Sequence, residues 1–503
     1  MVMIRYISTI VILMVLNACN GPSNEEAQLE DYRPAYHFTP KKGWMNDPNG
    51  LVFIDGVYHL FFQHNPDSTV WGPMHWGHAT STDLIHWEEQ PIALFPDSLG
   101  TIFSGSAVID RDNTAGFGKD ALVAIFTHHN HDIEKQQTGL HQYQSIAYSL
   151  DKGITWTKYS GNPVLPNPGI WDFRDPKVMW HEEGQQWIMT LATKQTITFY
   201  GSKNLKEWTR LSEFGENIGA HGGVWECPDL LQFATPEGDK WVLLVSINPG
   251  GPNAGSATQY FVGDFDGKTF TTTQQDIKWM DYGPDNYAGV TFSNTANRKI
   301  LIGWMSNWEY ANVVPASTWR SGMTIARELG LEEHDGQWLL TAVPVKELDR
   351  VLEDSDVIER IDVEKELDLS TEVMPLNNTF EGSFVMQKTT GFEIQLANES
   401  GEQLSFGYDQ SKNEYYIDRS KAGDASFNET FPKRAVAARI GSPAPLAFRF
   451  LIDRNSIEIF ADQGKINMSA LFFAKDAFSK MNFRVDDLTT IENLQVKGVN
   501  VKK

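Results

Sequence analysis

The sequence contains very few cysteines. Only Cys19 and Cys227 occur among 503 residues, so at most one internal disulfide can form, and none can form if Cys19 is modified. A disulfide-stabilised scaffold is therefore excluded. With 41% hydrophobic and 12% aromatic residues, the chain can instead bury a large core, and its length predicts two or three domains.

Positive charge is also scarce. Lys and Arg total 42 against 65 Asp and Glu, which gives a formal net charge of −23. A protein that binds nucleic acid needs clustered basic side chains, and no such cluster is visible. The composition therefore argues against a nucleic-acid partner and is compatible with a neutral or cationic ligand.

No hydrophobic run is long enough to span a bilayer comfortably. Residues 1–18 carry one Arg and a short apolar run, which is typical of a secretory signal peptide. The run ends in LNAC at Cys19, which resembles a bacterial lipobox and implies lipidation of Cys19; a chance cysteine beside an ordinary cleavage site is the alternative. Residues 19–30 predict an acidic, polar tether. We therefore expect an exported lipoprotein on the outer-membrane surface of a Gram-negative bacterium.

Long helical patterns are also lacking, and hairpins recur instead. The segment LVFIDGVYHLFF turns at Asp55-Gly56 and follows WMNDPNG, which carries Asp47 in an expected turn. FRDP with Asp175 and ECPD with Glu226 open similar units, and two less acidic units start at Ser104 and Tyr287. STDLIHW, SLDKGITW and SKNLKEW add a turn and a Trp after three of the hairpins.

Five such units predict an all-β fold, with a five-bladed β-propeller over residues 31–346. A pair of β-sandwiches that share hairpin spacing explains the aligned acids less well. Residues 347–357 predict a linker or short helix. Alternating segments in residues 358–503, such as GFEIQLANE and LAFRFLID, predict a C-terminal β-sandwich that serves as support or contacts carbohydrate.

The propeller predicts where the acids meet. The innermost strand of each blade begins beside the central axis, so Asp47, Asp175 and Glu226 should face one funnel. Hard metals need several oxygen ligands, often from one loop, and zinc needs His or Cys. The only His-rich run, THHNHDIE at residues 127–134, predicts a polar loop at the rim in preference to a metal site, so we expect no metal and no cofactor.

Glycosidic cleavage suits three convergent acids. It needs one protonated carboxyl group to donate to the leaving oxygen and one ionised group to attack the sugar. A purely structural cluster of buried acids is disfavoured by charge repulsion. Trp44, Trp71, Trp171 and Trp225 lie near the unit starts and are candidates for stacking on sugar rings, although a single Trp is more often part of the core.

Six motifs, in order, resemble glycoside hydrolase family 32, the fructan-cleaving enzymes. They are WMNDPNG, FSGSAV, FRDPKV, WECPDL, DYGPDNYAG and TWRSGMTIARELGL, and IDRNSIEIFADQG resembles a motif of the family's C-terminal sandwich. The resemblance covers nearly the whole mature chain. It implies a five-bladed propeller followed by a β-sandwich, which agrees with the repeat analysis.

The resemblance also implies roles. Asp47 would be the nucleophile that forms a covalent fructosyl-enzyme, Glu226 the general acid and then base, and Asp175 the transition-state stabiliser that binds fructose hydroxyls. Retention by double displacement implies carboxyl groups of Asp47 and Glu226 roughly 5 Å apart. Further matching positions would contact the terminal fructose: Asn46, Gln63, Trp71, Ser104, Arg174 and Trp308.

The neighbours of these acids suggest their charge states. We expect Arg174 to keep Asp175 ionised, and an apolar or like-charged setting to keep Glu226 protonated. Cys227 either helps shape that setting or is simply a small buried hydrophobic residue.

Substrate and mode of action are less constrained. A surface tether favours an endo-acting enzyme that cuts levan into importable pieces, with exo-acting release of fructose from fructans or sucrose as the alternative. The residues are also compatible with a non-catalytic fructan-binding lipoprotein, an arabinan-type propeller hydrolase and fructosyl transfer. The expected partners are a fructan polysaccharide or oligosaccharide, and a membrane only through the lipid at Cys19.

Overall fold

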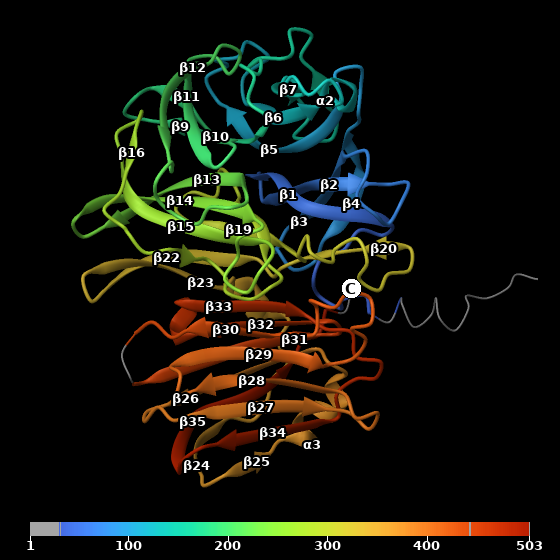
Figure 1. Ribbon diagram of the computed structural model, residues 1–503, viewed down its shortest axis with the longest axis vertical. Coiled ribbons are helices and arrows are strands. Elements are labelled where there is room, and N and C mark those ends of the chain that lie inside the picture. Colours follow the sequence, from blue (N-terminus) through green and yellow to red (C-terminus); the bar gives the residue numbers. More distant parts are fainter. Residues whose placement is uncertain (1–29, 31, 442–443, 502–503) are drawn as a thin grey trace, which may run out of the picture.

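Figure 1 shows the computed structural model, which describes residues 30, 32–441 and 444–501. Five sheets, coloured blue to yellow, make up the upper part of the molecule in this view. Two six-stranded sheets, coloured orange and red, lie beneath them. The expected signal peptide and Cys19 lie outside the described residues. Within the described residues, no helix is both long and apolar enough to cross a membrane.

Each of the first five sheets is one blade of a five-bladed β-propeller. Blade 1 contains β1 (Gly43–Ile54), β2 (Val57–Asn65), β3 (His75–Ser81) and β4 (Glu88–Leu94). Blade 2 contains β5 (Thr101–Asp110), β6 (Ala121–His129), β7 (Gln142–Ser149) and β8 (Thr157–Lys158). Blade 3 contains β9 (Phe173–His181), β10 (Gln186–Thr193), β11 (Thr196–Ser202) and β12 (Thr209–Phe214).

Blades 4 and 5 carry additional short strands. Blade 4 contains β13 (Val224–Thr235), β14 (Gly238–Asn248), β15 (Ala257–Phe265), β16 (Phe270–Thr271) and β17 (Lys278–Trp279). Blade 5 contains β18 (Tyr287–Thr291), β19 (Ile300–Met305), β21 (Gly322–Met323), β22 (Arg327–His334) and β23 (Gln337–Pro344).

Backbone pairing between the first and last blades closes the ring. Strand β20 (Trp319–Arg320) follows β19 in the chain, but it pairs in parallel with β1 of blade 1. The Gly43 N–H donates to the carbonyl of Thr318 at 2.7 Å. A parallel bridge between Val52 and Ser293 joins the same two blades further along. The two ends of the propeller are therefore held by hydrogen bonds as well as by packing.

The expected turn at Asp55-Gly56 is present, with φ angles of 49° and 87°, as a tight hairpin requires. The strand before it is longer than expected. Because β1 begins at Gly43, WMNDPNG lies inside the strand, and FRDP and ECPD likewise lie inside β9 and β13. The expectation of acid-bearing turns ahead of the strands is therefore wrong.

Bulges, not turns, interrupt the strands at these motifs. All five innermost strands show a register shift near their start, between the following residues: Met45 and Pro48, Ile102 and Gly105, Arg174 and Lys177, Glu226 and Asp229, and Tyr287 and Val290. Asp175, Cys227 and Ala288 have positive φ angles within these irregularities. A bulge leaves a residue outside the hydrogen-bonded ladder and redirects its side chain, which also accommodates a proline that has no N–H to donate.

The Trp-containing turns have the same geometry in three blades. The indole N–H donates to a carbonyl three residues earlier at 3.1, 3.2 and 3.1 Å, in the pairs Trp87 with Leu84, Trp156 with Gly153, and Trp208 with Leu205. Each Trp lies immediately before the fourth strand of its blade. The sequence repeat thus corresponds to one recurring structural unit.

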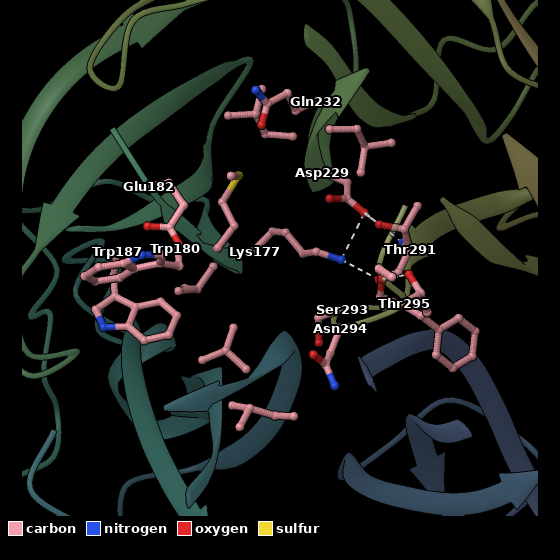
Figure 2. Close-up of a pocket in the computed structure, with 18 of the residues that line it drawn as sticks. Lys177, Trp180, Glu182, Trp187, Asp229, Gln232, Thr291, Ser293, Asn294 and Thr295 are labelled. Carbon is pink, nitrogen blue, oxygen red and sulfur yellow. Dashed lines mark hydrogen bonds and ion pairs between the residues drawn. The ribbon is translucent and has the colours of Figure 1, made fainter. Parts of the chain in front are cut away.

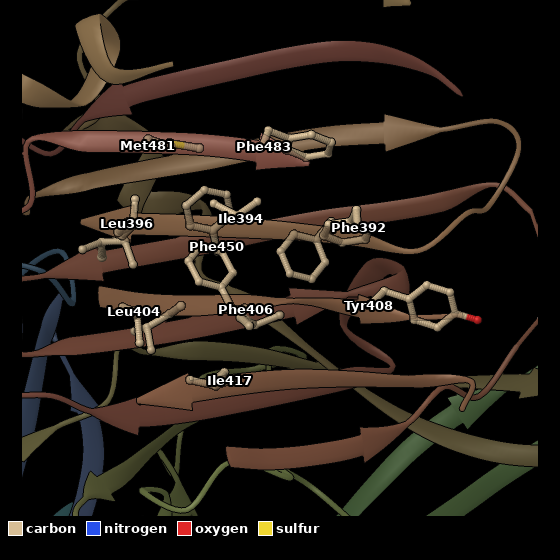
Figure 3. Close-up of a cluster of buried hydrophobic side chains, with 14 of the residues drawn as sticks. Phe392, Ile394, Leu396, Leu404, Phe406, Tyr408, Ile417, Phe450, Met481 and Phe483 are labelled. Atoms are coloured by element: carbon tan, nitrogen blue, oxygen red, sulfur yellow. The ribbon is translucent and has the colours of Figure 1, made fainter. Parts of the chain in front are cut away.

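The C-terminal β-sandwich consists of two six-stranded sheets. One has the order β24 (Ile358–Val363), β35 (Thr489–Gly498), β26 (Phe380–Met386), β31 (Leu446–Asp453), β32 (Ser456–Ala461) and β33 (Ile466–Leu471). The other has the order β25 (Glu366–Asp368), β34 (Lys480–Val485), β27 (Phe392–Ala397), β28 (Gln403–Asp409), β29 (Glu414–Lys421) and β30 (Arg434–Ala438). Alternate residues of β27, namely Phe392, Ile394 and Leu396, point into the core between the sheets (Figure 3).

Helical structure is limited to single turns in the described residues. These are α2 (His131–Glu134), η1 (Lys346–Arg350), α3 (Ser370–Val373), η2 (Met374–Leu376) and η3 (Asp462–Gly464). The short helix η1 falls in the region expected to connect propeller and sandwich.

Two cavities lie along the innermost strands of the ring. The Lys177 ammonium lies 3.0 Å from Asp229 and donates to the carbonyl of Thr291 at 2.6 Å (Figure 2). Beside this ion pair, a cavity of about 380 Å³ is lined by the later parts of β5, β9 and β13. A second cavity, described below, lies at the beginnings of the same strands.

Buried charges hold the sandwich against the propeller. The imidazole of His37, just before blade 1, lies 2.8 Å from Asp453 and 2.7 Å from Glu458. Arg327 of blade 5 also binds Glu458. Both acids belong to IDRNSIEIFADQG, so this motif supplies interface contacts. Burial lowers the pKa of His37, but its hydrogen bonds and charge interactions with the two acids raise it to about 9.

This shift makes the stability of the domain interface dependent on pH. Because the pKa of His37 is higher in the folded state than its unfolded value of about 6.5, its charge stabilises the fold fully below that pH. The contribution is lost as the pH rises through about 9. His37→Gln should therefore destabilise the protein more at about pH 6 than at about pH 10, by up to about 3 kcal/mol.

Urea unfolding of parent and variant at both pH values measures this difference. His86→Gln is the matched control, because His86 pairs with Asp83 on the surface and should show little effect at either pH. An equal loss of unfolding free energy for His37→Gln at both pH values would contradict the assignment.

Candidate active site

A cavity of about 420 Å³ opens where the five innermost strands begin. Its lining includes Asp47 of β1, Ser104 of β5, Asp175 of β9 and Glu226 of β13. Tyr287, the first residue of β18, donates its hydroxyl proton to Glu226. The structure thus brings the starts of all five sequence units to one place.

The three expected catalytic acids and all six positions expected to contact the terminal fructose line this cavity. Besides the three acids, these are Asn46, Gln63, Trp71, Ser104, Arg174 and Trp308. Their placement follows from the bulged strands and the ring geometry. Their individual roles remain predictions.

Asp47 is held by three side chains. Its carboxylate accepts hydrogen bonds from Asn46 at 3.0 Å and Ser104 at 2.8 Å, and the thiol of Cys227 lies 3.5 Å away. Burial and the nearby charge of Glu226 raise the pKa of Asp47, while these hydrogen bonds lower it. The two oxygens are therefore fixed in position before a substrate arrives.

Asp175 is more strongly perturbed. Its side-chain oxygen accepts the backbone N–H of Cys227 at 3.0 Å, and its own N–H donates to Thr127 at 3.0 Å. Burial raises the pKa of Asp175 to about 7, with further contributions from the charges of Glu226 and Asp47. Arg174 acts in the expected direction, because its charge lowers the pKa of Asp175, but it does not cancel the effect of burial.

Arg174 binds different acids from the one expected. Its guanidinium donates to Glu226 at 2.8 and 3.1 Å and to Asp172 at 2.6 Å. Tyr287 donates to the other oxygen of Glu226. The expected like-charged neighbours are present, because the charge of Glu226 acts on both Asp47 and Asp175, but the bound cation and phenol were not expected. The carboxyl group of Glu226 is clamped by a cation on one oxygen and a phenol on the other.

Cys227 lies between the other two acids. Its thiol is 3.5 Å from Asp47 and 3.6 Å from Asp175. Burial and the surrounding carboxylates raise the pKa of the thiol well above its usual value. A thiol that stays protonated donates weakly to both acids, so Cys227 is both a buried space-filling residue and a contact of the site.

The expected aromatic contacts divide into two groups. Trp44 and Trp225 are fully buried and cannot stack on a sugar, which corrects that expectation. Trp71 and Trp171 are 39% and 40% exposed at the rim. Trp308 lines the cavity and stacks on Trp44, with ring centroids 5.9 Å apart.

Gln63 offers an unsatisfied donor. The residue is 2% exposed, and its amide nitrogen has no hydrogen-bond partner in the part of the chain that the structure describes. Such a buried donor is costly without a partner. A sugar hydroxyl would satisfy it.

Sequence reasoning missed several cavity residues. Asp172 and Gln142 hold Arg174, and Phe103, His129, His131, Glu134, His141 and Asn248 also line the cavity. Asp172 lies two residues before Arg174 in WDFRDP, so its position in the unit could have indicated a place near the cavity. Tyr287 begins the fifth unit, at the position where three other units carry an acid, and could have been found in the same way. His129 ends β6, and His131, Glu134 and His141 lie in the β6–β7 connection. Residues 127–134 were expected as a polar loop at the rim, but nothing in the repeat gave their individual contacts.

His129, His131 and Glu134 form the one group with metal-like spacing among the described residues. Their nearest side-chain atoms are 3.1 to 3.3 Å apart, close to the ligand separations around tetrahedral zinc. The hydrogen bonds that surround these three residues do not fit a bound metal, however. Gln142 accepts the Phe173 N–H at 2.8 Å through its oxygen, so its amide nitrogen donates to Nδ1 of His129 at 3.2 Å.

This contact fixes the tautomer of His129. Burial lowers the pKa of His129 to about 4, so the ring is neutral and carries its proton on Nε2, the nitrogen that a metal would need. A metal-bound histidine instead donates from its other nitrogen. The three residues are therefore a hydrogen-bonded group in which His129 donates to Glu134.

The fold and the convergent carboxylates define a glycoside hydrolase. Two family models match the chain: the glycosyl hydrolases family 32 N-terminal domain over residues 37–342, and the family 32 C-terminal domain over residues 347–498. The chain belongs to glycosyl hydrolases family 32.

The names of similar proteins agree with this membership. A levanase of Bacillus subtilis (strain 168) is 46% identical over 459 residues, which cover 87% of this chain and 65% of the levanase. The crystal structure of exo-inulinase from Aspergillus awamori has a TM-score of 0.82 at 37% identity, covering 93% of this chain and 97% of that one. A fructofuranosidase from Schwanniomyces occidentalis complexed with fructose has a TM-score of 0.81 at 34% identity, covering 94% and 99%.

The contacts of Asp47 predict a change in pH dependence. Ser104→Ala removes a hydrogen bond that lowers the pKa of Asp47. If Asp47 must be ionised, the acidic limb of kcat/KM should move upward by about 0.7 pH units, which corresponds to about 1 kcal/mol. Rate measurements across the acidic range on any cleaved fructoside test this.

Ser106→Ala is the matched control for this prediction. Ser106 lies two residues along β5, and its hydroxyl donates to the carbonyl of Pro176 and accepts the Val178 N–H. Its loss should affect stability and leave the acidic limb in place. A limb that does not move in Ser104→Ala would show that this bond does not tune the ionisation that limits the rate.

Proposed function

We propose that this protein hydrolyses β-fructofuranosidic linkages in fructans with retention of configuration, as an endo-acting levanase on the cell surface. The observation that carries the hydrolase assignment is the meeting of Asp47, Asp175 and Glu226 in one cavity. The family membership and the names of the relatives support a fructan substrate.

Each acid suits one step of a double displacement. Asp47 attacks the anomeric carbon of the fructosyl unit while Glu226 gives its proton to the leaving oxygen, so that a bond to Asp47 forms as the glycosidic bond breaks. Glu226, now ionised, then takes a proton from the water that releases the fructosyl unit, with any sugars still attached to it, from Asp47. Asp175 accepts hydrogen bonds from fructose hydroxyls and steadies the positive charge that develops on the ring.

The clamp on Glu226 favours the proton transfer. When Glu226 loses its proton, the new carboxylate is already opposite the guanidinium of Arg174 and the hydroxyl of Tyr287. Burial and the charge of Glu226 raise the pKa of Tyr287 well above its usual value, so the phenol remains a donor. These fixed donors stabilise charge where it appears, which is the main way in which protein sites accelerate such steps.

The endo mode rests on the expected location rather than on the cavity. An enzyme tethered at the cell surface gains most by cutting polymer into pieces that can be imported. The similarity to exo-inulinase favours exo-acting release of fructose as the second candidate. A non-catalytic fructan-binding protein is a weaker candidate, because such a protein has no need of three acids that converge in one cavity.

Digestion of levan, inulin and sucrose in separate reactions tests the proposal. Oligosaccharides should appear before fructose when the parent protein acts on levan, and Asp47→Asn should reduce the rate by about three orders of magnitude or more. Chromatography of the earliest products measures both effects.

Asp132→Asn is the control for this experiment, because Asp132 pairs with Lys135 on the surface. It should cleave levan at the parental rate. Fructose as the sole early product would replace the endo assignment with the exo one. If the parent protein binds levan and cleaves none of the three substrates, the hydrolase proposal is wrong.

The lipoprotein proposal has a separate test. Cys19→Ala should abolish incorporation of labelled fatty acid and move the full-length protein from the membrane fraction to the soluble fraction. Protease treatment of intact cells should remove the parent protein if it faces outward. Unchanged labelling in the variant would show that Cys19 is not the lipidated residue.

A further inference from the structure

The connection between β6 and β7 forms one side of the cavity. We call His129–His141 the α2 rim, because α2 (His131–Glu134) lies within it; Figure 1 labels α2 beside β6 and β7. The side chain of Asn130 caps this helix by accepting the N–H groups of Asp132 and Ile133, each at 3.1 Å. Its cavity-lining residues are His129, His131, Glu134 and His141.

A chain of contacts links the α2 rim to the proposed general acid. Glu226 accepts from Arg174 at 2.8 Å, and Arg174 donates to Gln142 at 3.4 Å. Gln142 then donates to His129 at 3.2 Å, and His129 donates to Glu134 at 3.1 Å. Three hydrogen bonds therefore connect the α2 rim to the Arg174 side of Glu226, and both line the same cavity.

One oxygen of the Glu134 carboxylate can accept a hydrogen bond from a ligand. One oxygen lies 3.1 Å from His129 and 3.3 Å from His131. No hydrogen bond reaches the other oxygen within the described part of the chain, and the side chain is 38% exposed. Although partial burial raises the pKa of Glu134, its interactions with His129 and His131 lower it overall, so it is a carboxylate at neutral pH.

Aromatic surfaces flank this acceptor. Trp171 lies 4.5 Å from the ring of His141, and Trp71 lies 6.4 Å from that of His131, measured between ring centroids. Both indoles are exposed at the cavity mouth. Sites for sugars combine such apolar faces with a few fixed acceptors for hydroxyl groups.

We propose that the α2 rim binds the sugar on the leaving-group side of the scissile bond, and that Glu134 determines specificity there by accepting hydrogen bonds from its hydroxyls. This inference rests on the proposed function, because it takes Glu226 as the proton donor. The inference assigns a binding place to the second unit of the substrate. That unit must then be a polyhydroxylated sugar and not a small alcohol.

Binding to a slowed enzyme tests this inference. In an Asp47→Asn background, calorimetry compares methyl β-fructofuranoside, which has no leaving-group sugar, with a β-2,6-linked fructotriose. Adding Glu134→Gln should weaken binding of the trisaccharide about tenfold, as expected for a lost hydrogen bond to a charged group. It should leave binding of the methyl fructoside within about twofold.

Asp132→Asn in the same background is the matched control, since it removes one carboxylate from the same helix outside the cavity and should change neither affinity. An equal loss for both ligands, or no loss for either, overturns the inference. If neither ligand binds to Asp47→Asn, the proposed function itself fails. The two failures are distinct, because the first leaves binding of the methyl fructoside measurable in the Asp47→Asn protein.

Discussion

Five sheets that close into a ring must place their innermost strands around one axis, and the site depends on this constraint. The first residues of these strands come from positions far apart in the chain, yet they have to share a small space. A bulge near the start of every inner strand turns a side chain out of the ladder and toward that space. Ring closure and local irregularity are thus both needed to assemble the carboxylates.

Three neighbouring carboxylates repel one another, and each of them is stabilised by a different set of hydrogen-bond donors. Glu226 receives the guanidinium of Arg174 and the phenol of Tyr287. Asp47 has only neutral donors, and Asp175 has a backbone amide and a thiol. The three acids of one cavity therefore have different partners, since Glu226 binds a cation and the other two accept hydrogen bonds from neutral groups.

The sequence predicted the parts of this site that repeat. A period of similar hairpins predicted five blades, and the blade geometry then placed Asp47, Asp175 and Glu226 together without any knowledge of contacts. Residues outside the repeat were not predictable in this way. Glu134 belongs to a single short connection; its His-rich sequence predicted a polar loop at the rim, but it did not predict the hydrogen bonds of Glu134 with His129 and His131. The partner of Arg174 was also misjudged, because the nearest acid in sequence is not the nearest in space when a bulge separates them.

The contacts of one segment connect the sandwich to the chemistry of the propeller. In DYGPDNYAG, Asp281 accepts from Arg327 at 2.7 Å and from the Ser469 hydroxyl at 2.7 Å. Asp285 accepts from Arg419 and from the Leu471 N–H of the sandwich at 2.5 and 2.8 Å. Tyr287, only two residues further on, donates to Glu226.

Such buried charge pairs are weak contributors to net stability but strong constraints on geometry, since breaking one leaves an uncompensated charge. The sandwich therefore fixes the backbone that positions Tyr287 and, through it, one oxygen of Glu226. The sequence left two uses open for this domain, support of the propeller or contact with carbohydrate, and these contacts favour support. They act close to Tyr287, whose displacement would directly disturb Glu226, the proposed proton donor.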